Sequence, residues 1–128
     1  VDTELAPVRA LIAHELFHCF QAFVHPARAY PLWASEGGAG WIGEDFAHSS
    51  AMSATWWASW ISRPQRPTHL RSYDAIGMYA IADRMGMNVH RLAMDLTGSG
   101  SFASYAAAVG DAGLEYRYAV DLTDLGLS

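Results

Sequence analysis

The sequence predicts a mainly α-helical fold that forms a single domain over residues 1–128. The first observation is length, because 128 residues are typical of one domain. The second is composition, since 52% hydrophobic and 16% charged residues exclude a disordered chain. The third is that apolar residues recur at helical spacing between stretches rich in proline, glycine and serine.

Six helices are expected, because six periodic stretches follow a capping residue or end at proline or glycine. They cover residues 5–24, 32–47, 51–62, 73–85, 88–97 and 101–109. Residues 114–122 fit a helix or a strand equally well, and a helix is favoured. The chain shows no internal repeat and no interdomain linker.

The first helix, residues 5–24, is expected to be capped by Thr3 and to tolerate Pro7 in its first turn. Its apolar residues cover more than one face, so we expect it to be buried over most of its circumference. Two histidines and a glutamate in its middle therefore need partners or a chemical role. Cys19 lies beside one of these histidines and is expected to be a small buried hydrophobe.

The second helix, residues 32–47, contains four glycines: Gly37, Gly38, Gly40 and Gly43. Each costs about 1 kcal/mol relative to alanine in a helix. Such a helix needs tertiary support, and close backbone approach to a neighbour is the compensation that we expect.

The later helices have their own start and stop signals. The expected caps are Ser49 or Ser50, Ser72 and Asn88, and the expected stops are Gly86, Gly98 and Gly110. The helix over residues 51–62 also carries three tryptophans: Trp56, Trp57 and Trp60. We interpret them as core or interface residues, with a hydrophobic substrate site as the alternative.

The charge pattern excludes several classes of function. The chain has 8 basic and 13 acidic residues, a formal net charge of −5, and no lysine. Its scattered arginines form no basic stripe, so nucleic-acid binding is not expected. A single cysteine excludes an internal disulfide and cysteine-pair zinc sites. No apolar run approaches the roughly 18 residues of a membrane span.

Residues 14–18 form the motif H-E-x-x-H. Residues four apart lie one above the other on a helix face, so the imidazoles of His14 and His18 can reach one ion. Neutral imidazole is a good zinc ligand. Glu15 adjoins the first histidine and is placed to take a proton from water activated by the metal.

A catalytic zinc ion needs a third protein ligand and an open position. The pattern H-E-x-x-H-x-x-G-x-x-H is not met, because Gln21 and Val24 occupy its last two defined positions. His25 comes one residue too late to share the ligand face. Glu36, early on the second helix, is the best alternative, since the nearby glycines would let the two helices approach closely.

H-E-x-x-H followed by W-x-x-E-G-x-A resembles the signature of gluzincin metallopeptidases, the clan of thermolysin and the aminopeptidase N-like enzymes. Here HELFH is followed by seventeen residues and then by the glutamate of WASEGGAGW. The similarity is strong over residues 10–45 and weaker over about 70–122. It implies a helical zincin-like half-domain, the C-terminal helical part of a gluzincin catalytic domain, with the H-E-x-x-H helix packed against the glutamate-ligand helix.

The resemblance also implies an activity, which is hydrolysis of a peptide or protein substrate. One Zn²⁺ per chain would be held by His14, His18 and Glu36, with Glu15 as the general base. Since many members of the clan are exported, a secreted or extracytoplasmic location is favoured.

A further donor is expected to stabilise the oxyanion, and Tyr73 is the first choice and His69 the second. The alternative for Tyr73 is packing at a helix start. Glu44 and Asp45 are interpreted as surface acids, with a hydrogen bond to a ligand histidine as the alternative.

Only about a dozen residues precede His14, so the sheet that gluzincins place before this helix is absent. We expect a missing N-terminal portion, or a partner chain, to supply substrate positioning; the alternative is a reduced domain that binds substrate differently. The alternative function is a non-catalytic helical binding module in which zinc is structural or absent. Hydrolysis of a non-peptide bond is a lesser option.

Overall fold

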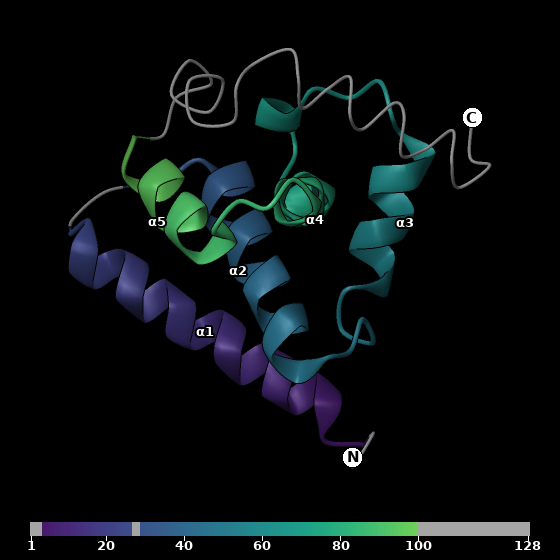
Figure 1. Cartoon of the computed structure of the whole chain (residues 1–128), viewed down its shortest axis with the longest axis horizontal. Helices are drawn as coiled ribbons and strands as arrows, with labels where there is room; N and C mark the ends of the chain where they lie inside the picture. The colour runs from purple at the N-terminus through teal and green to yellow at the C-terminus, as the bar shows by residue number, and fades with distance from the viewer. Residues whose placement is uncertain (1–3, 27–28, 100–128) are drawn as a thin grey trace.

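A computed structural model describes residues 4–26 and 29–99, and all regular elements in these residues are helical. They are α1 (Ala6–Val24), α2 (Leu32–Ala47), α3 (Ala54–Ser62), η1 (Thr68–Leu70), η2 (Tyr73–Ala75), α4 (Ile76–Arg84) and α5 (Val89–Ser99), with η marking 3₁₀ turns (Figure 1). The predicted mainly α fold is confirmed. The expected helix over 101–109 and the segment 114–122 lie outside the described residues.

Helix α2 lies at the centre of the arrangement, between α1 on one side and α3 on the other (Figure 1). It packs against α1, α4, α5 and η2. The buried core gathers around it, and its largest side chains include Trp33, Trp60, Ile76, Met78, Tyr79 and Leu96. Because α2 packs along α1, Glu36 of α2 lies opposite His14 and His18 of α1.

The bounds predicted for the second helix are confirmed, and so is the reason for its glycines. A Cβ at Gly37 would lie 2.8 Å from the Cβ of Ala75, and a Cβ at Gly38 would lie 2.9 Å from the Cβ of Ala93. Real Cβ atoms do not approach other atoms this closely without a shift. The glycines therefore let η2 and α5 reach the backbone of α2.

The predicted all-round burial of the first helix is wrong. The buried residues of α1 follow one face: Ala6, Ala10, His14, Phe17 and Gln21. Most of its other apolar side chains are exposed, with Phe20 at 60% and Phe23 at 85%. The reason is that α2 and α5 pack against a single side of α1. Pro7 lies in the first turn as expected, but Leu5 occupies the N-cap position without a side-chain bond, and Thr3 lies outside the described residues.

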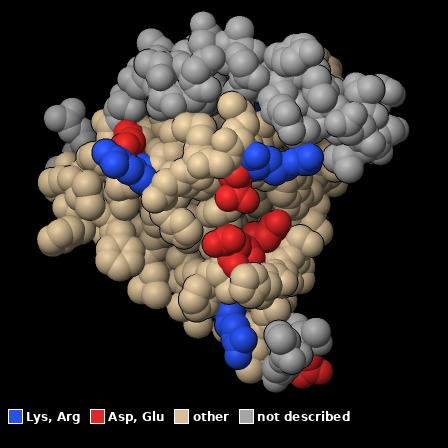
Figure 2. Space-filling view, viewed as in Figure 1, with Lys and Arg blue, Asp and Glu red and all other residues tan. Residues whose placement is uncertain are grey.

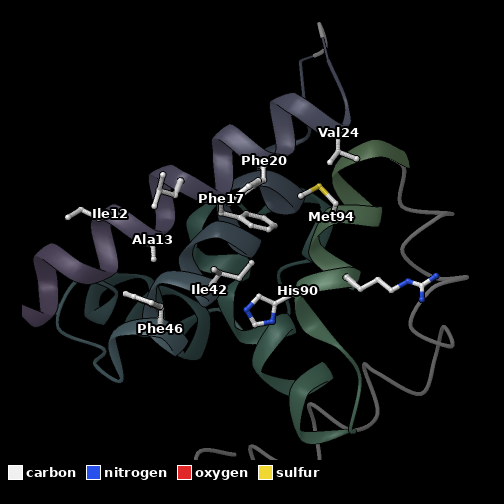
Figure 3. Close-up of a pocket in the computed structure, with 11 residues that line it drawn as sticks. Ile12, Ala13, Phe17, Phe20, Val24, Ile42, Phe46, His90 and Met94 are labelled. Carbon is white, nitrogen blue, oxygen red and sulfur yellow. The ribbon is translucent and has the colours of Figure 1, made fainter.

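The exposed side of α1 borders an apolar groove of about 570 Å³ between α1, α2 and α5 (Figure 3). Its apolar lining includes Ile12, Leu16, Phe17, Phe20, Ile42, Phe46 and Met94. No helix in the described ranges has the length and hydropathy needed to cross a membrane. On the face shown in Figure 2, the charged side chains lie in a few small groups, with wide uncharged surface between the groups.

The predicted caps of α3 are wrong, because the helix begins at Ala54 and its N-cap is Ser53. The Ser53 hydroxyl makes no capping bond and instead donates to the carboxylate of Glu44. Trp57 Nε1 donates to the same carboxylate at 2.8 Å. Bonds to α2 thus decide where this helix starts. Trp60 is buried in the core, and the other two tryptophans of α3 are partly buried against it.

The expected helix over 73–85 begins as the 3₁₀ turn η2 and continues as α4. Ser72 precedes it but makes no side-chain cap; its N–H donates to Asp74 Oδ1 at 3.0 Å. Asp74 also accepts bonds from Ser59 and Arg71, at 2.9 and 3.1 Å. The predicted stop is confirmed, since Gly86 has a φ of +82°.

Asn88 caps α5 as predicted, because its Oδ1 accepts the N–H of Arg91 at 3.1 Å. Gly98 does not end the helix, which runs on to Ser99, so this prediction is wrong. A side chain at Gly98 would overlap the ring of His25. Gly98 therefore allows α1 and α5 to meet, and Gly110 lies outside the described residues.

Candidate metal centre

Helices α1 and α2 bring His14, His18 and Glu36 together. The two histidines stand one turn apart on α1, and Glu36 faces them from the first half of α2. Glu36 Oε2 lies 3.1 Å from the Nε2 atom of each histidine, and the two Nε2 atoms are 3.1 Å apart. These three side chains thus form an equilateral triangle of potential ligand atoms.

The sides of the triangle are close to the spacing of ligand atoms around a metal ion. Zinc binds nitrogen at about 2.0–2.1 Å, so neighbouring ligand atoms in a tetrahedral shell lie about 3.4 Å apart. Two imidazoles and a carboxylate are also a ligand set that zinc uses in catalytic sites. In residues 4–26 and 29–99, the cluster contains no fourth His, Cys, Asp or Glu. The donor set therefore fits a zinc ion.

Burial keeps His14 in the form that binds metal. Its ring is buried, and burial lowers the pKa of His14 from its ordinary value, as does the neighbouring charge of His18. The hydrogen bond and charge of Glu36, and the charge of Glu15, act in the opposite direction but do not outweigh these effects. A neutral imidazole has a free nitrogen lone pair, so His14 is poised as a ligand at neutral pH.

Tyr73 lies beside the cluster. Its ring stacks on that of Trp56, with centroids 4.9 Å apart, and lies nearly parallel to the His14 ring at 6.0 Å. Burial raises the pKa of Tyr73, and so do the charge of Glu36, a hydrogen bond to Glu36 and the charge of Glu15. The phenol therefore keeps its proton at neutral pH and can donate it in a hydrogen bond.

The other donor candidate, His69, lies on the turn η1 and is exposed. Tyr73, the other candidate, has a ring contact to His14.

Glu15 is exposed on α1. Its negative charge contributes to the pKa shifts of both His14 and Tyr73, so this charge acts on two side chains of the site.

Several other predicted neighbours have different roles. His25 Nε2 contacts the carbonyl of Met94 at 3.0 Å, so its ring faces α5 and not the cluster, as expected. Glu44 bonds α3 rather than a ligand histidine, and Asp45 is exposed. Cys19 is exposed, so its predicted burial is wrong; it lies on the side of α1 that α2 leaves uncovered.

Two residues at the cluster were not predicted to belong to it. Trp56 lies 6.0 Å from the His14 ring and forms a wall with Tyr73. Gln21 Oε1 lies 2.6 Å from His18 Nδ1. Gln21 could have been found from its spacing, because positions 14, 18 and 21 share one helix face. For Trp56, the sequence offered only the alternative of a hydrophobic substrate site shared with Trp57 and Trp60.

Comparison of the chain with protein-family models, with curated proteins and with solved structures finds no match.

Proposed function

We propose that this chain is a zinc-dependent metallopeptidase of the gluzincin type, or the metal-binding part of one. The observation that carries the proposal is the triangle of His14 Nε2, His18 Nε2 and Glu36 Oε2, with 3.1 Å sides. The cluster has three potential ligands in the described part of the chain, and this favours an open catalytic position over a closed structural site.

Bound zinc would act as a Lewis acid and would lower the pKa of a water molecule bound to it towards neutral pH. His14, His18 and Glu36 would hold it. Glu15 would accept the proton of the attacking water and pass it to the leaving amine.

Tyr73 would donate its hydroxyl hydrogen bond to the substrate carbonyl oxygen as negative charge develops there. The raised pKa of Tyr73 supports this role, because a phenolate could not donate.

The first test is metal content. We expect one zinc per chain by elemental analysis after reconstitution and desalting, and loss of that zinc in His18→Ala. His48→Asn is the matched control, because the His48 side chain is exposed. The backbone of His48 is in the left-handed region at the end of α2, and asparagine tolerates this conformation. Wild-type protein that stays free of zinc would end the proposal.

The second test separates catalysis from a structural metal. Glu15→Gln should retain zinc but lose cleavage of a mixed-sequence quenched peptide library by about 10²-fold or more. If the alternative binding module is correct, wild type and Glu15→Gln will both be inactive, and removing zinc will only lower the melting temperature.

A further inference from the structure

Gln21 is a polar side chain with no exposed surface, and it lies directly behind the metal cluster. Its Oε1 is 2.6 Å from Nδ1 of His18, the nitrogen that faces away from Glu36. Its Nε2 is 2.7 Å from Thr97 Oγ1 on α5 and 3.4 Å from the carbonyl oxygen of Ser35 on α2. One amide therefore joins three helices at the back of a candidate ligand.

The partners of this amide determine its orientation. The backbone carbonyl of Ser35 can only accept, so the amide NH₂ of Gln21 must point towards it. Thr97 donates its own proton to the carbonyl of Ala93 at 2.7 Å, so its oxygen accepts from the same NH₂. Reversing the amide would set its oxygen against the Ser35 carbonyl. Gln21 Oε1 therefore faces His18.

The orientation of the amide then determines the tautomer of His18. An amide oxygen only accepts, so Nδ1 of His18 carries a proton and donates it to Gln21. In the neutral ring, Nε2 then has a free lone pair, and this atom faces Glu36 Oε2 and His14 Nε2.

We propose that Gln21 is a positioning residue for metal binding: it holds His18 in the Nδ1–H tautomer and aims Nε2 into the cluster, and Thr97 anchors it to α5. The inference rests on the proposed metal site. Metal-binding histidines commonly donate their second nitrogen to a carboxylate or a carbonyl, and loss of that partner costs 10–100-fold in affinity. A neutral amide orients the ring without adding negative charge behind the metal.

The first experiment uses the metal-free wild-type protein, so that folding of a variant is not needed. Two-bond ¹H–¹⁵N correlation spectra distinguish the two neutral histidine tautomers. We expect His18 to show a protonated Nδ1 and a bare Nε2. A His18 ring protonated at Nε2 alone would overturn the proposal.

The second experiment measures zinc affinity by competition with a chromophoric chelator. Gln21→Leu removes the acceptor and should weaken zinc binding about 10–100-fold. Gln21→Glu keeps an oxygen at the position and should restore the affinity to within a few-fold of wild type. The visible spectrum of the Co²⁺ form should change in Gln21→Leu and return towards wild type in Gln21→Glu.

The outcomes separate this inference from the proposed function. A wild type that binds no zinc contradicts the metal site itself. A wild type that binds zinc, with Gln21→Leu of equal affinity and an unchanged Co²⁺ spectrum, contradicts only the role of Gln21. If Gln21→Leu does not fold, Thr97→Val takes its place: it keeps Gln21 but removes the anchor on α5, and should weaken zinc binding several-fold. Unchanged affinity there overturns the anchoring.

Discussion

Gly43 of α2 lies against the backbone of Ala10 in α1, so closely that a Cβ on Gly43 would be 2.5 Å from the Ala10 carbonyl oxygen. The same Cβ would be 3.5 Å from the Cβ of His14. Since Glu36 must reach His14 from α2, the separation of the two helices at Gly43 contributes directly to the geometry of the cluster.

Gly43→Ala should therefore force α1 and α2 apart. The backbone carbonyl cannot move as a side chain can, so we expect a loss of about 2 kcal/mol in the free energy of unfolding and weaker zinc binding. Gly40→Ala is the comparison, because its Cβ would meet the ring of Trp56 at 3.1 Å, and this side chain can shift. Urea unfolding measures the free energy of unfolding of both variants. Equal stability of the two variants would contradict the explanation.

Tyr73→Phe tests the donor. The variant keeps a ring to stack on Trp56, so stability and zinc content should stay near those of wild type. Loss of the hydroxyl removes the donor to the developing oxyanion, and kcat should fall by about 10²–10³-fold with little change in KM. His69→Ala should leave kcat within a few-fold. A fall in activity for His69→Ala alone would reverse the two assignments.

Asp74→Asn should give a pH-dependent loss of stability. Burial raises the pKa of Asp74, but the bonds from Ser72 and Ser59 and the charge of Arg71 outweigh it, so the pKa lies below its ordinary value. The ionised carboxylate therefore stabilises the fold above the unfolded pKa, and this contribution is lost as pH falls through the folded pKa. We expect a deficit of about 2 kcal/mol at neutral pH that shrinks below about pH 4. A deficit independent of pH would show that the charge is not involved.

Glu44→Ala should loosen α3. Glu44 accepts hydrogen bonds from Ser53 and Trp57, which join α3 to α2. We expect a loss of about 1–2 kcal/mol in the free energy of unfolding and a change in tryptophan fluorescence. Asp45→Ala is the matched control, because the Asp45 carboxylate adjoins Glu44 in the sequence but is exposed. Its loss should change the free energy of unfolding by less than about 0.5 kcal/mol. Comparable losses in the two variants would contradict the anchoring.

Much of the helical architecture could be predicted from the sequence. The bounds of α2 agree with the prediction, and those of α1 differ by one residue at the start. Both depend on local signals, namely apolar spacing and the prolines at the helix ends. The start of α3 was not predicted, because the Ser53 hydroxyl donates to Glu44 of α2, and the sequence did not indicate this bond. The contact of Gly98 with His25 was not predicted either, because these residues are far apart in sequence.

The sequence by itself determined that His14 and His18 share a helix face, because helical geometry relates residues four apart. It also singled out Glu36, but only the packing of α1 on α2 could bring its carboxylate to 3.1 Å from both imidazoles. Only the tertiary structure placed Thr97 behind Gln21, and left one side of α1 uncovered. The physical reason is that spacing along a helix is a property of the local backbone, whereas contact between helices depends on how every side chain of both surfaces packs.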